Sequence, residues 1–220
     1  MELAHKIPTQ HRDAFVIKTE AIALRIGVNA QDLMAIMDFE SAGTFSPSIQ
    51  NKGGNNYFGL IQFGTSAAKD LGTSLNKLKQ LSALEQLDYV EAWFMLWRKR
   101  RGAITNFADL YLTVLLPKGI GYGLTDALPF TAKQIQQNKG LCDGKGRITK
   151  ASILKKFAQR YPWILAQNNI KDAVQQTPDS YITSSNNSFE HVPQVAVEDT
   201  NTAQTMVIGA AALVLIVAIS

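Results

Sequence analysis

The sequence has few of the side chains on which several hydrolytic chemistries depend. It contains one cysteine, Cys142, so no disulfide can form within the chain. It contains three histidines, and His5, His11 and His191 all fall outside the segment that we expect to form the globular core. A Cys-His endopeptidase, a Ser-His-Asp hydrolase and a histidine-ligated zinc amidase each need a histidine in that core. The sequence therefore disfavours all three reactions.

Positive charge is absent from the last part of the chain. All 22 lysines and arginines lie at or before Lys171, whereas 5 of the 18 acidic residues follow it. Residues 1–171 thus hold 22 cationic and 13 acidic side chains, a formal charge of +9. Such a domain suits an anionic polymer, either nucleic acid or a cell-wall glycan with its peptide carboxylates. The basic run at residues 98–101 is explained by a helix end, and no zinc-ligand spacing accompanies it, so we expect no nucleic-acid partner.

Long apolar runs are also scarce, and the one that exists ends the chain. Met1 to Asp13 is polar, so we expect no N-terminal signal peptide. Residues 176–205 are rich in Ser, Asn, Thr, Gln and acids, which predicts a flexible acidic linker. Residues 206–219 are all apolar, although a membrane span normally needs about 17 residues or more. Because a core helix would not be apolar on every side, we expect residues 206–220 to insert into a membrane as a hydrophobic helix.

Apolar spacing and capping residues predict a mainly α-helical domain over residues 13–175, preceded by an N-terminal approach segment of residues 1–12. Residues 46–63, which are rich in Pro, Asn, Gly and aromatics, are expected to form a loop or a short hairpin. Two short helices should follow, over residues 65–71 and 74–81. Longer helices are expected to begin at the capping residues Asp13, Asn29, Ser82, Asn106 and Thr149.

Glu40 is the candidate general acid. It follows Leu33 by seven residues and Ile36 by four, so it shares the apolar face of its helix, near the helix C-terminus. Burial and the negative end of the helix dipole both disfavour a carboxylate, and a raised pKa is expected. Such a group can donate a proton to a glycosidic oxygen. An acid at a helix end is more often only a solvated surface group, so further signals are needed.

Two ordered motifs supply those signals. Glu40-Ser41-Ala42-Gly43 is followed by Gly59-Leu60-Ile61-Gln62, and then by Ala67-Ala68 and Leu71-Gly72. This pattern resembles the lysozyme-like lytic transglycosylases, whose relatives include goose-type lysozyme. In that family the first motif is Glu-Ser, a small residue and Gly, and the second is Gly-Leu-Met-Gln or a close variant. The resemblance covers residues 14–120.

The resemblance implies a lysozyme-like fold with a groove for the glycan strand and a reaction that needs neither cofactor nor metal. Glu40 would act first as the acid and then as the base. Ser41 would hydrogen-bond near the acid and the substrate, Gly59 would let the backbone approach the sugar, and Gln62 would offer its amide to the ring substituents. The alternatives are a serine at a helix end, a turn glycine and an exposed glutamine.

The third motif departs from the family pattern. The family has Ala-Tyr-Asn before a Gly, whereas residues 115–119 here read Leu-Leu-Pro-Lys-Gly, a form that resembles phage-encoded members. Another aromatic side chain is then needed to face the sugar. The candidates are Tyr57, Phe63, Tyr111 and Tyr122, although such residues more often pack in a core or loop than face a sugar.

A second carboxylate would favour hydrolysis over transglycosylation. Asp70 is the nearest candidate after the motifs, but its place on a short helix is better explained as a surface position. A single acid fits attack by the sugar's own hydroxyl, which leaves a 1,6-anhydro end, as the resemblance implies. We therefore prefer a lytic transglycosylase to a hydrolytic lysozyme.

The glycine-rich residues 143–149 lack the acids of a calcium loop and are expected to be a turn.

The phage-like third motif and the terminal apolar segment together resemble virion-associated enzymes of membrane-containing phages. That resemblance implies peptidoglycan as substrate, a lipid membrane and other virion proteins as partners, and cell-wall degradation during genome delivery. A bacterial membrane-bound enzyme and a phage lysis factor fit the same features. The alternative of another class is a catalytically inactive virion or membrane-adaptor protein that keeps the fold.

Overall fold

The computed structural model of the chain describes residues 1–51 and 56–167. Within these ranges it is helical, with nine α-helices, three short 3-10 helices and no strand beyond isolated bridges. The predicted mainly α-helical class is therefore confirmed for this part of the chain. The predicted linker and the terminal apolar segment lie outside the described residues.

The helices follow one another with short connections. In chain order they are η1 Glu2–Lys6, α1 Thr9–Ile26, α2 Ala30–Glu40, α3 Thr65–Asp70, α4 Leu75–Gln80, α5 Ala83–Arg101, α6 Phe107–Leu115, η2 Pro117–Gly119, α7 Ala132–Gln137, η3 Lys139–Leu141, α8 Lys150–Ala158 and α9 Trp163–Gln167.

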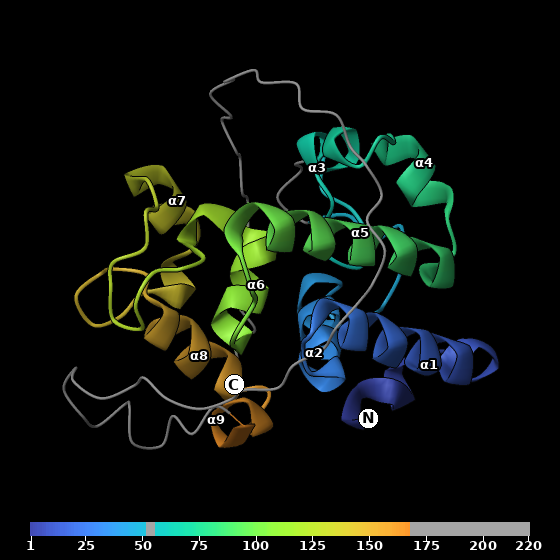
Figure 1. Ribbon diagram of the computed structural model, residues 1–220, viewed down its shortest axis with the longest axis horizontal. Helices are drawn as coiled ribbons and strands as arrows, with labels where there is room; N and C mark the ends of the chain where they lie inside the picture. The colour runs from blue at the N-terminus through green and yellow to red at the C-terminus, as the bar shows by residue number, and fades with distance from the viewer. Residues whose placement is uncertain (52–55, 168–220) are drawn as a thin grey trace, which may run out of the picture.

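The long helix α5 crosses the middle of the molecule and joins its two ends (Figure 1). Helices α1 and α2 lie below it at one end, where α1 packs along α5, and α3 and α4 lie above it. Helices α6, α7 and α8 form the other end, with α8 packed against α6. Helix α2 lies between the two groups and contacts α1, α6 and η1. It is therefore surrounded by other elements.

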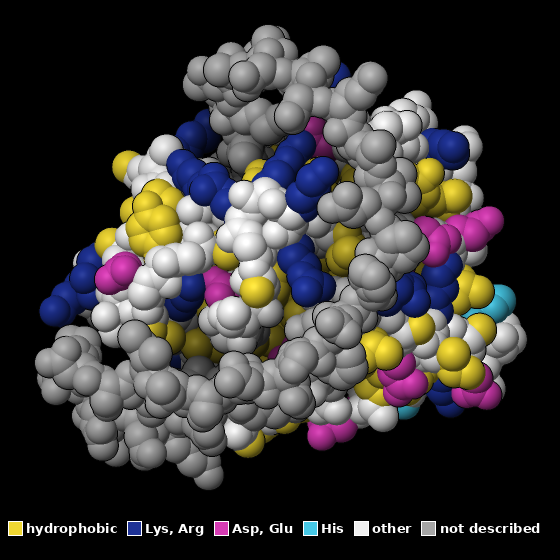
Figure 2. Space-filling view, in the orientation of Figure 1, with side chains coloured by type: hydrophobic (Ala, Val, Ile, Leu, Met, Phe, Trp, Pro, Cys, Tyr) yellow, Lys and Arg dark blue, Asp and Glu magenta, His cyan; other side chains and the backbone are white. Residues whose placement is uncertain are grey.

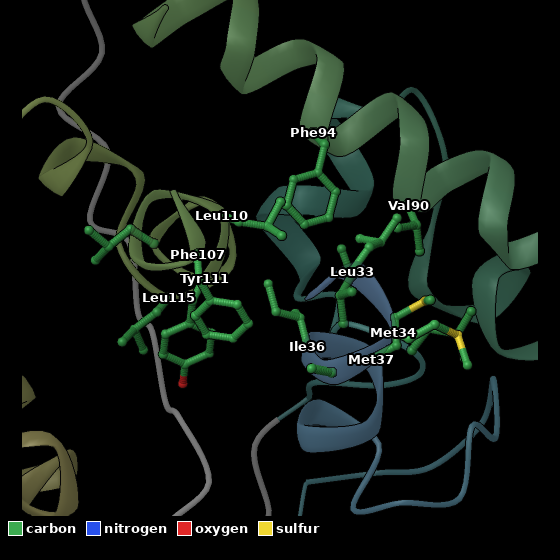
Figure 3. Packing of buried hydrophobic residues seen from close by; sticks show 14 of the residues in the cluster. Leu33, Met34, Ile36, Met37, Val90, Phe94, Phe107, Leu110, Tyr111 and Leu115 are labelled. Carbon is green, nitrogen blue, oxygen red and sulfur yellow. The ribbon is translucent and has the colours of Figure 1, made fainter. Parts of the chain in front are cut away.

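The core is built around α2. Residues 33–37 of this helix are completely buried, which is expected only of a helix that meets protein on all sides. Figure 3 shows Leu33 and Ile36 of α2 beside Phe94 of α5 and Leu110 of α6. Tyr111 and Phe107 continue the same cluster on α6. The C-terminal end of α2 thus points into the protein interior.

Most of the predicted helix starts are confirmed. Asn29 accepts a hydrogen bond from the Gln31 backbone N–H, and Ser82 forms a complete capping box with Glu85. Asn106 and Thr149 cap α6 and α8 in the same way. Each of these caps satisfies N–H groups that the helix itself cannot pair.

The predicted start of the first helix was wrong. Asp13 lies inside α1, which begins at Thr9 directly after Pro8. The proline has a fixed φ that suits the approach to a helix, and Leu3 and Ile7 before it are buried in the common core. The predicted boundary at residue 12 consequently falls within a helix, and the N-terminal segment packs with the rest of the domain.

Two further differences concern the later part of the chain. The helix expected to run from Thr149 toward Tyr161 ends at Ala158, and a separate helix, α9, follows Pro162. Helix α7, with a capping box between Thr131 and Gln134, was not predicted. Both helices have about one and a half turns, too few residues for an apolar period to stand out. Of the predicted loop or hairpin at residues 46–63, the described parts, residues 46–51 and 56–63, form isolated bridges and no regular strand.

The basic run lies in the last turn of α5, where we expected it, and one of its residues also bonds to another helix. Arg98 extends across to the C-terminus of α1 and donates from Nη1 to the Arg25 and Ile26 carbonyl oxygens, at 3.0 and 2.8 Å. These carbonyls belong to the last turn of α1, which ends at Gly27 in the left-handed conformation (φ 81°). A cation at this end also opposes the helix dipole.

We expect Arg98→Met to lower the free energy of unfolding by about 1 kcal/mol, because two carbonyl oxygens of α1 lose a charged donor. Urea denaturation of the full chain measures this. Arg101→Met is the matched control, since Arg101 is an exposed residue in the last turn of the same helix, and it should change stability by less than about 0.5 kcal/mol. Equal effects of the two substitutions would contradict the capping role.

Candidate active site

Glu40 is the last residue of α2 and only 7% exposed. Because this end of the helix lies among other elements, the carboxyl group is removed from water. Burial raises its pKa from 4.5 to about 8, and the neighbouring Tyr111 hydroxyl offsets part of this rise. The expectation of a buried acid with a raised pKa is met by the geometry. At neutral pH Glu40 holds its proton and can donate it.

Tyr111 is the aromatic residue that the structure brings to Glu40. It is completely buried on α6, and its ring packs against Phe39 at 5.8 Å and Phe157 at 4.5 Å between ring centroids. Burial, and then the nearby Glu40, raise the pKa of its hydroxyl. The two groups interact electrostatically, yet no described residue forms a hydrogen bond of normal geometry with the Tyr111 hydroxyl. The hydroxyl is thus fixed in place and available to Glu40 when the carboxyl ionises.

Ser41 lies in the turn after Glu40. It is completely buried, and its Oγ accepts a hydrogen bond of 2.9 Å from the Phe45 backbone N–H. The turn is tight, because Ala42 and Phe45 both have positive φ angles, of 52° and 49°. Such angles cost free energy in residues with a side chain, and they persist where the surroundings enforce them. The Ser41 hydroxyl therefore holds the backbone that follows the acid.

The second motif is held in place by a residue that sequence reasoning missed. Gln86 of α5 is completely buried, and its Oε1 accepts a hydrogen bond of 2.7 Å from the Leu60 N–H. Its Nε2 donates to the Pro47 and Leu78 carbonyl oxygens, both at 2.9 Å. A Cβ at Gly59 would lie 2.2 Å from Gln86 Oε1, and Gly59 has a φ of +85°. The glycine is thus needed for the loop to meet α5.

Gln62 closes the same loop from the other side. Its backbone has a φ of 54°, and its side-chain Nε2 donates to the Gly59 and Ile49 carbonyl oxygens, at 3.1 and 3.3 Å. Its Oε1 is buried, and no described residue donates to it. The amide nitrogen of Gln62 therefore donates both of its hydrogen bonds within the loop, and the amide oxygen can still accept one. A buried acceptor without a partner is unusual in a folded protein and is a candidate for ligand contact.

The other predicted site residues have different surroundings. Phe63 is buried in the core and does not present a ring to solvent. Tyr57 is half-buried and packs against Gly64, whereas Tyr122 is 40% exposed in the segment after η2. Asp70 pairs with Arg100 of α5 at 3.4 Å, which accounts for it as a surface ion pair.

The sequence contained signals that could have identified Gln86 and could have singled out Tyr111 from the four aromatic candidates. Gln86 precedes Val90 by four residues and lies on the apolar stripe of α5, where a polar side chain needs a special reason. Tyr111 follows Phe107 by four residues on the apolar side of α6. The position of Gln86 or Tyr111 in its helix does not indicate which group the Gln86 amide or the Tyr111 hydroxyl contacts. The partners come from distant parts of the chain.

The described part of the chain holds no group of three or more His, Cys, Asp or Glu side chains placed to bind a metal ion. Two surface cavities, of about 470 and 370 Å³, lie away from Glu40. The larger is lined by the α1–α2 turn and the start of α6, and the smaller by residues 140–147 and α8.

Comparison with protein-family models, with curated proteins and with solved structures gives no match to this chain. Among the described helices, none is long and apolar enough to cross a membrane.

The buried carboxyl group of Glu40 should make stability depend on pH. Its pKa is higher in the folded protein than in the unfolded chain, so its contribution is complete below about pH 4.5 and is lost as pH rises toward 8. Glu40→Gln removes this ionisation. We expect the variant to become more stable than the wild type across this range, by as much as about 4 kcal/mol at pH 8. Urea denaturation of both proteins at pH 4, 6 and 8 measures the difference, and a difference that stays constant with pH would contradict a raised pKa.

Proposed function

We propose that the chain is a peptidoglycan lytic transglycosylase that cleaves the linkage between MurNAc and GlcNAc with Glu40 as its general acid and base. The observation that carries the proposal is the buried carboxyl group at the end of α2, which is protonated at neutral pH and lies beside the Tyr111 hydroxyl. The two motifs support it, since each ends in a tight turn held by buried hydrogen bonds.

The reaction needs one proton donor that later accepts a proton. Glu40 donates its proton to the glycosidic oxygen as the bond from this oxygen to C1 of MurNAc breaks. The ionised carboxylate then accepts the proton of the MurNAc 6-hydroxyl, whose oxygen bonds to C1 and closes the 1,6-anhydro ring. Glu40 is left protonated, as at the start, and no water is consumed. The Tyr111 hydroxyl stabilises the carboxylate between the two steps by turning its proton toward it.

A hydrolytic lysozyme is the nearest alternative. An inverting or retaining glycosidase uses a second carboxylate, as a base for water or as a nucleophile. Asp70, the predicted candidate, is engaged by Arg100. That ion pair favours the single-acid mechanism.

A catalytically inactive virion or membrane-adaptor protein is the alternative of another class. It is favoured by the third motif, where Leu116 and Pro117 are buried packing residues and the family's Tyr and Asn are missing.

Digestion of purified peptidoglycan by the full-length chain tests both alternatives. We expect the wild type to release muropeptides and Glu40→Gln to be slower by about 10² to 10⁴, because the proton donor is lost. Glu91→Gln, the same substitution in a surface ion pair with Arg25, is the control and should keep the activity. Mass spectrometry should find anhydro ends; reducing ends would indicate a hydrolase, and an inactive wild type would indicate the adaptor.

We further propose that the chain is attached to a membrane through residues 206–220, in a phage virion or, alternatively, in a bacterial membrane facing the wall. The support is the sequence of this segment, with its 14 apolar residues. The basic domain is suited to the anionic wall. On the face shown in Figure 2, Lys and Arg side chains are spread widely, and acidic side chains gather mostly on the side where α1 lies.

Flotation with liposomes tests the attachment. We expect the full chain to float with neutral vesicles at high salt, where adsorption of the basic domain is screened, and a chain without residues 206–220 to stay at the bottom. A second comparison with anionic vesicles at low salt measures the contribution of the basic domain. Equal behaviour of the two chains at high salt would refute membrane insertion.

A further inference from the structure

Asp38 is the most heavily bonded side chain near Glu40. It lies in the last turn of α2, two residues before Glu40, and is completely buried. Its Oδ1 accepts from Lys6 Nζ at 2.7 Å, and its Oδ2 accepts from Arg160 Nη2 at 2.5 Å and from the Tyr161 hydroxyl at 2.8 Å. Two cations and one hydroxyl therefore converge on one carboxylate.

The three partners come from both ends of the domain. Lys6 is the last residue of η1, and Arg160 and Tyr161 follow α8. The Lys6 and Arg160 side chains are 28% and 38% exposed, so the carboxylate is inside while its cations remain in contact with solvent. Such a pair avoids much of the desolvation cost of a fully buried ion pair. The arrangement fastens the N-terminal segment and the end of α8 to the helix that carries Glu40.

The turn after Glu40 is fastened to the same place. The Gly43 N–H donates to the Asp38 carbonyl oxygen at 2.7 Å, and a Cβ at Gly43 would lie 3.5 Å from Asp38 Oδ1 and 3.6 Å from Arg160 Nη2. The chain therefore leaves Asp38, passes through Glu40 and returns to the Asp38 backbone, close to the Asp38 side chain. Asp38 before Glu40 and Gly43 after it therefore lie together at this cluster.

We propose that Asp38 is a positioning residue for Glu40, which holds the last turn of α2 and the following turn so that the acid stays buried beside Tyr111. This inference rests on the proposed function, since it assigns a role in the same reaction. Asp38 acts on Glu40 by fixing its position and not through the charge of the Asp38 carboxylate. Burial and the Tyr111 hydroxyl are the influences that set the Glu40 pKa, and the Asp38 charge is not among them.

A purely stabilising role is the competing explanation, and a second buried ion pair provides the control. Asp109 of α6 pairs with Lys150 of α8 at 2.6 Å, and both side chains are almost completely buried. Asp109→Asn removes the same carboxylate charge from a buried pair without touching α2. Removing one partner of a buried pair destabilises a protein strongly, so both substitutions should lower stability.

The experiment follows the titration of Glu40 in the full chain by NMR of ¹³C-labelled glutamate carboxyl groups, with Glu40→Gln assigning the signal. Tyr161→Phe is the main variant, because it removes one bond to Asp38 without changing any charge, and Asp38→Asn is the stronger one. If Asp38 positions Glu40, its loss lets water reach the acid. We expect the Glu40 pKa to fall by about one unit or more, a tenfold change in proton affinity, in Asp38→Asn and by less in Tyr161→Phe.

The same variants are tested on peptidoglycan, where kcat should fall about tenfold for Asp38→Asn while KM stays near the wild-type value. Asp109→Asn should leave both the titration and kcat unchanged at temperatures where it is folded. If the Glu40 titration is the same in all variants, or shifts equally in Asp109→Asn, the positioning role is overturned. A shifted titration in a chain whose wild type releases no muropeptides would overturn the proposed function and leave the positioning of Glu40 supported.

Discussion

The burial of residues 32–38 and Glu40 of α2 is the constraint on which the rest of the structure depends. The helix meets α1, α6 and η1, and its residues 33–37 are accordingly apolar on every side. The helix ends at Glu40, so this carboxyl group is placed in the interior at the negative end of the helix dipole. The chemistry available to Glu40 is thus a consequence of packing, since the same residue at the end of a surface helix would be an ordinary carboxylate.

Sequence reasoning predicted the parts of this arrangement that depend on local pattern. The caps at Asn29, Ser82 and Thr149 are local contacts between residues two or three apart. Each could be predicted from the residue types and their spacing in the sequence. The burial of Glu40 followed from its spacing after Leu33 and Ile36. The start of α1 could not be found in this way, because Pro8 and the packing of Leu3 and Ile7 outweigh the capping preference of Asp13.

The rest of the site depends on contacts between distant segments. The Gly59 turn is explained by Gln86, 27 residues later, and the carboxylate of Asp38 is held by Arg160, more than 100 residues later. A glycine in a sequence indicates only that the position has no room for a side chain or has a backbone conformation that disfavours one. Whether a substrate or another part of the protein fills the space is decided by the fold, and at Gly59 the fold fills it with the Gln86 amide.

Asp38 and Glu40 show how two acids in one helical turn can be given different tasks. Both are buried, but two cations and a hydroxyl surround Asp38, whereas Glu40 has the Tyr111 hydroxyl and no cation among the influences on its pKa. Paired carboxylates in contrasting environments are a common way to separate an acid from a charged partner. Here the contrast is set by rotation, because residues two apart on a helix point about 200° apart. Asp38 therefore faces η1 and the end of α8, whereas Glu40 faces α6. The last turn of α2 thus joins these two segments through Asp38 and also bears the buried carboxyl group of Glu40.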